Sequence, residues 1–306
     1  MTSGTRDRRL TVGQMDVGAN RVLTSFVYCL WRPAEAVELP DMCGIAGYSL
    51  NPESPVERTL AAQALLAGIA ERGADAVGYA SRGAEGAVAV TKLRGGASAL
   101  LDEIALPASA EQALIHVRDY TKGHPEIAAN NHPIRHGAVV GIHNGIIEND
   151  DDVLARYGLE RAERNMTVDS EAIFALMELR RHAPRALGEL RGAMAAAWLD
   201  ERDPSTLFLA RGLARPLWIG RTRTDLFFAS TRRALAIVEA ALRVRLELTE
   251  VHEGRLLHVI HGRIVRERRF RPDRRYRDES YLPPVRAPQE AVFCLERLAV
   301  LTAPAG

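Results

Sequence analysis

Short apolar runs, bounded by glycine, proline or charged residues, recur along most of the chain. Such runs are typical of buried β-strands. We expect strands at residues 43–50, 76–81, 87–93, 113–117, 139–143, 193–199, 207–210, 217–219 and 226–229. Residues 251–265, with turns at 252–255 and 261–262, predict one or two hairpins.

Helical periodicity separates these runs. Segment 56–72 places four apolar residues on one face, which predicts an amphipathic helix on a sheet: Ala62, Leu65, Leu66 and Ile69. Asp169 is expected to cap a helix that runs through Leu179, and 234–241 predicts another helix. Strands in runs, with helices grouped near 57–71, 151–180 and 232–241, predict an α+β fold.

Composition narrows the function classes. The chain has 306 residues, 47% of them apolar, which suffices for one large or two small domains. The net charge of +1 favours neither a nucleic-acid nor an anionic-membrane partner, and no run reaches the ~20 apolar residues of a membrane span. Three dispersed cysteines without a CxxC pair indicate no disulfide framework and fit a reducing cytoplasm.

The segment MCGIAGY (42–48) places Cys43 directly after a possible initiator methionine. If Cys43 becomes the first residue, its own α-amine, with a pKa near 8, can act as the base for its thiol. We therefore interpret residues 1–41 as a mis-called start or a propeptide, although 22–31 faintly resembles a signal peptide. By itself the motif also fits a small buried thiol in a strand.

Four further segments follow in a fixed order: RGADAVG (72–78), HVRDYTKG (116–123), HNGIIEN (143–149) and TVDSE (167–171). With CGIAGY they resemble the glutaminase domain of the class II (N-terminal nucleophile) glutamine amidotransferases, over about residues 43–265. The resemblance implies an Ntn-hydrolase-like, four-layer αββα sandwich with two antiparallel sheets.

The resemblance also implies roles for the chemistry. Cys43 would be the nucleophile and its α-amine the proton carrier. Asn144 and Gly145 would form the oxyanion hole, through the Asn side-chain amide and the Gly backbone N–H. The more common use of Asn-Gly is a tight hairpin turn.

Substrate recognition is assigned in the same way. Arg118 would clamp the α-carboxylate of glutamine, a task suited to its planar fork. Asp169 would pair with the α-ammonium, and Thr121 would add a hydroxyl or backbone contact. His132 matches a histidine near the family's site, although a lone histidine is more often structural. Arg72 would have a positioning role.

The chain departs from the family pattern where an aromatic residue usually follows the arginine. Asp119 stands there instead, and Tyr120 follows one position later. In the family, that aromatic residue belongs to a loop that closes over glutamine as a lid. With Asp119 in its place, the packing of the lid is in doubt. The remaining histidines show no metal-ligand spacing, and neither a metal nor another cofactor is predicted.

We expect three segments: 1–41, the amidotransferase domain at 42–265, and an Arg- and Pro-rich tail at 266–306. Because the tail is too short for a synthase, the sequence predicts a stand-alone glutaminase that supplies ammonia to a separate synthase subunit. Two alternatives are a hydrolase of another γ-glutamyl compound and a glutamine-binding regulatory subunit. Eight Arg against two acids in 263–277 fit a solvated charge run or an interface arm.

Overall fold

The computed structural model describes residues 43–83, 85–277 and 285–303. The expected mis-called start or propeptide at 1–41 lies outside these described residues.

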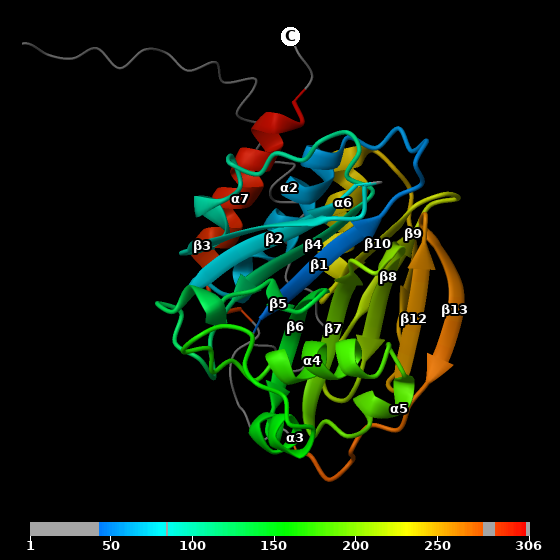
Figure 1. Ribbon diagram of the computed structural model, residues 1–306. Helices are drawn as coiled ribbons and strands as arrows, with labels where there is room; N and C mark the ends of the chain where they lie inside the picture. Colours follow the sequence, from blue (N-terminus) through cyan, green and yellow to red (C-terminus); the bar gives the residue numbers. More distant parts are fainter. Residues whose placement is uncertain (1–42, 84, 278–284, 304–306) are drawn as a thin grey trace, which may run out of the picture. The chain divides into compact units, whose positions relative to one another are not determined.

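The described strands form two antiparallel sheets (Figure 1). The β1 sheet has seven strands in the order β11 (Glu247–Glu250), β9 (Trp218–Arg221), β10 (Leu226–Ala229), β1 (Gly44–Ser49), β4 (Gln112–Arg118), β2 (Ala76–Arg82) and β3 (Val88–Arg94). The β6 sheet has six strands in the order β13 (Arg263–Arg269), β12 (Arg255–Ile260), β8 (Asp203–Arg211), β7 (Gly192–Asp200), β6 (Val139–Ile147) and β5 (Ile134–His136).

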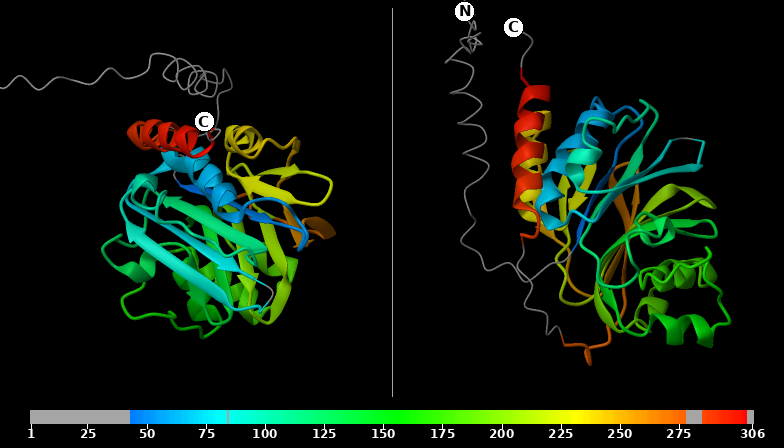
Figure 2. Two further views of the ribbon diagram at one scale, coloured as in Figure 1. Left: turned by 90° about the horizontal axis from the view of Figure 1, so that it is seen from above. Right: turned by 90° about the vertical axis from the view of Figure 1, so that its left-hand side faces the viewer.

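The two sheets pack face to face, with helices on both outer sides (Figure 2, right). Buried side chains from both sheets share one core, among them Ile45, Leu114, Phe228, Ile142, Ala195 and Leu209. The β1 sheet is covered by α2 (Arg58–Ile69), α6 (Arg232–Leu242) and α7 (Pro288–Leu301). The β6 sheet is covered by α3 (Asp150–Arg156), α4 (Glu171–Leu179) and α5 (Pro184–Leu187). The expected four-layer αββα sandwich is confirmed.

Short 3-10 helices complete the described elements: η1 (Ala70–Arg72), η2 (Ala97–Ala99) and η3 (Ala128–Asn130). Segment 251–265 contains one hairpin, β12–β13, which turns at His261 and Gly262. The turn expected at 252–255 instead leads from β11 in one sheet to β12 in the other. Such a turn has the same kinds of residues whether it joins neighbouring strands or connects two sheets. The local sequence pattern therefore cannot distinguish the two.

One local expectation was wrong, and one alternative is excluded. The N-cap of α4 is Ser170 rather than Asp169, whose carboxylate accepts a hydrogen bond from the Ile147 N–H of β6. Asn144 and Gly145 lie inside β6, not in a hairpin turn. In both cases a contact between elements distant in sequence decides the local structure.

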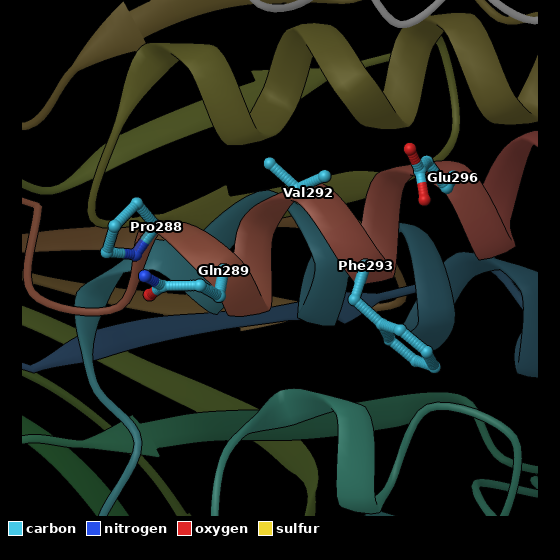
Figure 3. A pocket seen from close by; sticks show the side chains of 5 residues that line it. All are labelled: Pro288, Gln289, Val292, Phe293 and Glu296. Atoms are coloured by element: carbon cyan, nitrogen blue, oxygen red, sulfur yellow. The ribbon is translucent and has the colours of Figure 1, made fainter.

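The expected boundary at residue 265 falls inside β13, and part of the expected tail forms α7. α7 packs against α2, η1 and η2 and buries an apolar stripe of Ala291, Cys294, Leu295 and Leu298. Its outer side borders a hollow of about 330 Å³, where Val292 and Phe293 are 39% and 49% exposed (Figure 3). Residues 288–301 therefore build the domain.

The Arg-rich stretch begins as β13, the edge strand of the β6 sheet. Most residues of β13 are exposed, Arg266 and Arg268 among them. Charged side chains on an edge strand oppose pairing with another chain. This placement favours the solvated charge run for residues 263–269.

Leu298→Ala tests whether α7 belongs to the cooperative unit. Leu298 is fully buried, so its truncation should lower the free energy of unfolding by about 2–5 kcal/mol. Val300→Ala, on the same helix but at a 53% exposed position, should change it by less than about 0.5 kcal/mol. Urea denaturation measures both, and equal effects would mean that α7 contributes nothing to the core.

Candidate functional site

Cys43 lies directly before β1, with 8% of its surface exposed. Its backbone N–H donates to Asn144 Oδ1 at 3.3 Å, and its thiol donates to the Asp119 carbonyl oxygen at 3.3 Å. Beside it is a narrow pocket of about 10 Å³. Six of the residues expected in the site line this pocket: Cys43, Arg118, Thr121, His132, Gly145 and Asp169.

The Cys43 thiol needs a base before it can act as a nucleophile. Burial raises its pKa to about 12, although the hydrogen bond to the Asp119 carbonyl and the charge of Arg118 oppose the shift. The thiol therefore keeps its proton at neutral pH. No histidine nitrogen within the described ranges is hydrogen-bonded to Sγ.

The histidines near the pocket are neutral. Burial lowers the pKa of both His116 and His143 to about 3, and that of His132 well below its usual value. His143 Nε2 lies 3.2 Å from the Ala193 carbonyl and Nδ1 lies 2.8 Å from Ser170 Oγ. Because a carbonyl only accepts, Nε2 carries the proton and Nδ1 accepts from the hydroxyl. His143 thus orients this part of β6.

Asn144 is hydrogen-bonded to Cys43, and Gly145 follows it in β6. Asn144 is fully buried; its Oδ1 accepts from Cys43, while its Nδ2 has no hydrogen-bond partner among the described residues. Gly145 has a φ of +139°, and a Cβ there would lie 2.0 Å from the Ala193 carbonyl oxygen. Only glycine fits this position. An unsatisfied buried amide next to a thiol is what an oxyanion requires.

Arg118 ends β4 and is 2% exposed. Nη1 donates to Asn131 Oδ1 at 2.5 Å, and Nη2 donates to the carbonyl oxygens of Lys122 (2.9 Å) and Gly123. A guanidinium has five N–H donors, so these three bonds leave donors for a carboxylate. The loop 119–123 is thus bound to Arg118; it is called the glutamine loop below because the sequence resemblance implies that it closes over glutamine.

Asp169 supplies the opposite charge. It is 3% exposed, and its Oδ2 accepts from the Ile147 N–H at 2.6 Å. Burial raises the pKa of this carboxyl to about 6, and nearby Asp150 adds to the shift. Across the part of the chain that the structure describes, no lysine or arginine forms an ion pair with it. A buried carboxylate without a cation suits an ammonium ligand.

The remaining expected residues differ in position. His132 is buried, stacks on His116 with ring centroids 4.1 Å apart, and has no hydrogen-bond partner for either ring nitrogen in the described residues. Thr121 is exposed at the pocket. Arg72 is 1% exposed and does not line the pocket, but its Cβ lies 3.1 Å from where a Cβ of Gly44 would be. It therefore adjoins the start of β1.

Other pocket residues were not selected from the sequence: Asp119, Tyr120, Lys122, His143, Val168 and Ser170. His143 and Ser170 are the sequence neighbours of Asn144 and Asp169, which were selected. Their position next to selected residues is the sequence signal that could have identified them. Lys122 Nζ donates to both carboxylate oxygens of Asp150, at 2.8 and 2.7 Å, a contact between segments that sequence patterns do not reveal.

The described residues contain no group of three or more His, Cys, Asp or Glu side chains that could hold a metal ion. Within the same ranges, every helix is too short or too polar to cross a bilayer.

Comparisons with known proteins fit this geometry. Residues 116–237 match a family described as a glutamine amidotransferase domain. Glutamine–fructose-6-phosphate aminotransferase [isomerizing] of Shigella flexneri is 33% identical over 208 residues, which are 63% of this chain and 32% of that protein. The Rhizobium meliloti protein of the same name is 33% identical over 204 residues, 64% of this chain and 32% of that protein. The chain thus spans about a third of the length of these curated relatives.

Solved structures agree on the fold. A glutamine phosphoribosylpyrophosphate amidotransferase from B. subtilis, complexed with ADP and GMP, superposes with a TM-score of 0.60 at 19% identity. The match covers 74% of this chain and 49% of that one. The chain thus carries a glutamine amidotransferase domain over residues 116–237, and its Cys43 pocket and fold fit the class II type that the sequence resembles.

Proposed function

We propose that the domain hydrolyses L-glutamine to glutamate and ammonia through a γ-glutamyl thioester on Cys43. One observation carries the proposal: Cys43, Arg118 and Asp169 line a single pocket, so a nucleophile meets a cation and an anion. Arg118 would hold the α-carboxylate of glutamine and Asp169 its α-ammonium. The side-chain amide of the substrate would then lie at Sγ.

The reaction follows from the groups around Sγ. The α-amine of Cys43 accepts the thiol proton, and Sγ attacks the side-chain carbonyl carbon of glutamine. Asn144 Nδ2 and the Gly145 N–H stabilise the oxyanion. The amine returns its proton to the leaving nitrogen, ammonia departs and the thioester remains. The amine then deprotonates a water molecule that attacks the thioester, which releases glutamate and restores the thiol.

This mechanism requires a free α-amine, so the active protein would begin at Cys43. The hydrogen bond from Cys43 N to Asn144 Oδ1 supports it, because that bond already places the nitrogen inside the site. The raised pKa of the thiol supports it too, since no histidine in the part of the chain that the structure describes is hydrogen-bonded to Sγ.

The ammonia would pass to a synthase on a separate chain. Free ammonia is protonated at neutral pH and then no longer a nucleophile, so a glutaminase is useful only close to its consumer. The curated relatives named above are aminotransferases of which this chain spans about a third, which supports a consumer of the ammonia but not its place on a separate chain. We place the reaction in the cytoplasm on the basis of the cysteine usage.

Two alternatives share the pocket. Arg118 and Asp169 would recognise only the glutamyl part, so another γ-glutamyl compound would bind in the same way. A glutamine-binding regulator with little turnover would also use both residues. The unsatisfied Asn144 amide favours catalysis over binding alone, because a regulator has no oxyanion to stabilise.

The first test compares a chain that begins at Cys43 with one that retains residues 1–42. Only the former should form a γ-glutamyl adduct on the Cys43 peptide, detected by mass spectrometry after acid quench of a single turnover with glutamine. Circular dichroism checks that both chains are folded. Equal turnover by both chains would refute the α-amine mechanism.

Asn144→Ala and Arg118→Lys should separate chemistry from binding. Loss of the oxyanion donor should lower kcat by about 10²–10³ with a smaller effect on KM. Lysine keeps the charge of Arg118 but loses the fork, so KM should rise as expected for the loss of about 1.5–3 kcal/mol. Steady-state kinetics measure both, and an Asn144→Ala variant with only KM raised would reassign Asn144 to binding.

Asp169→Asn should raise the free energy of unfolding and abolish glutamine binding. The folded-state pKa of about 6 lies above the ordinary value of 3.8, so the native carboxyl holds its proton more tightly and stability falls as pH rises between them. Asparagine removes this loss and should raise the free energy of unfolding by roughly 1–3 kcal/mol at pH 8, and by less at pH 4.5. Denaturant titrations at both pH values test this. Glutamine binding should be lost, and a variant that is less stable at pH 8 would contradict the assignment.

A further inference from the structure

The glutamine loop lies over Cys43 and is held by polar contacts. The Asp119 carbonyl oxygen accepts from the Cys43 thiol, and the Tyr120 N–H donates to Asp75 Oδ2 at 2.8 Å. Tyr120 itself is 43% exposed, so its ring does not supply an apolar anchor in place of the family's aromatic residue. The loop therefore depends on its charged neighbours.

Asp119 has one such neighbour in the C-terminal segment. Its carboxylate accepts from Arg286 Nε at 2.9 Å, with the two side chains 17% and 31% exposed. Burial raises the pKa of the Asp119 carboxyl, the charge of Asp75 raises it further, and Arg286 opposes both. Arg286 thus compensates two carboxylates that would otherwise repel each other at the base of the loop.

Arg286 is itself anchored to the body of the domain. The backbone N–H groups of Arg286 and Ala287 both donate to the Glu71 carbonyl oxygen, at 2.8 and 2.9 Å. In the first turn of α7, Glu290 accepts from the Ser98 N–H at 2.7 Å and from its hydroxyl at 2.9 Å. Because the backbone of Arg286 is fixed in this way, its guanidinium can determine the position of Asp119.

We propose that Arg286 is a positioning residue that holds the glutamine loop closed through Asp119. The pair fixes Asp119, whose carbonyl oxygen accepts from the Cys43 thiol. The inference rests on the proposed glutaminase function for its kinetic consequence. If the ion pair stabilises the closed loop, loss of the pair lowers the population of the closed state. The apparent affinity for glutamine then falls in proportion to that population.

The test uses substitutions at both ends of the pair in the active protein. Arg286→Gln should raise KM for glutamine about three- to tenfold, the range of a partly buried ion pair, with kcat within about twofold. Arg286→Lys keeps the charge and should recover most of the affinity. In the Asp119→Asn background, Arg286→Gln should have no further effect. Equal effects of Arg286→Gln in both backgrounds would overturn the proposal.

Arg297→Gln is the matched control. Arg297 also lies on the C-terminal segment, and its Nε pairs with Asp102 of the domain body at 2.7 Å, away from the loop. It should leave KM unchanged. A rise in KM as large as that of Arg286→Gln would show a general effect of loosening α7 and would refute the specific role.

A second readout does not depend on turnover. Opening of the loop exposes Sγ, so iodoacetamide should alkylate Cys43 faster in Arg286→Gln than in the wild type or Arg297→Gln, measured on the Cys43 peptide by mass spectrometry. Faster alkylation without any glutamine turnover in the wild type would sink the proposed function but keep the loop contact. Unchanged alkylation in Arg286→Gln would overturn the contact itself.

Discussion

The site depends on the face-to-face packing of the β1 sheet on the β6 sheet. The start of β1 carries Cys43 and the middle of β6 carries Asn144, and one hydrogen bond of 3.3 Å joins them across the sheets. Toward α2, the strand is packed closely as well: a Cβ at Gly44 would lie 2.9 Å from the Ile69 Cβ. Core substitutions that change the sheet separation would therefore act directly on the nucleophile.

The pocket keeps several polar groups unsatisfied, at a cost to stability. Asn144 Nδ2 and both ring nitrogens of His132 lack partners in the described residues, and Asp169 is a buried carboxylate without a cation. Groups of this kind destabilise a fold unless a ligand completes them. Their concentration around Cys43 indicates that this part of the structure is built for a bound molecule rather than for stability.

The sequence predicted the sheets because they have local signatures, and six of the expected site residues line one pocket. Short apolar runs predicted β1, β2 and β4, and the ordered motifs singled out Cys43, Arg118 and Asp169. The rest depends on contacts between distant segments. The Asp169 carboxylate accepts from the Ile147 N–H instead of capping α4. Arg286, near the end of the chain, forms an ion pair with Asp119. No periodicity or spacing records such pairs.

The placement of Asn144 and Gly145 inside β6 has a consequence for substrate selectivity. Both are held in register by β7, opposite Ala195 and Met194, whereas most of the pocket wall around the ligand comes from the glutamine loop and the segment before α4. On the proposed mechanism, oxyanion stabilisation and most of the pocket wall are thus encoded in separate parts of the chain. Exchange of loop residues would then change the amide substrate while the strand that stabilises the oxyanion stays unaltered.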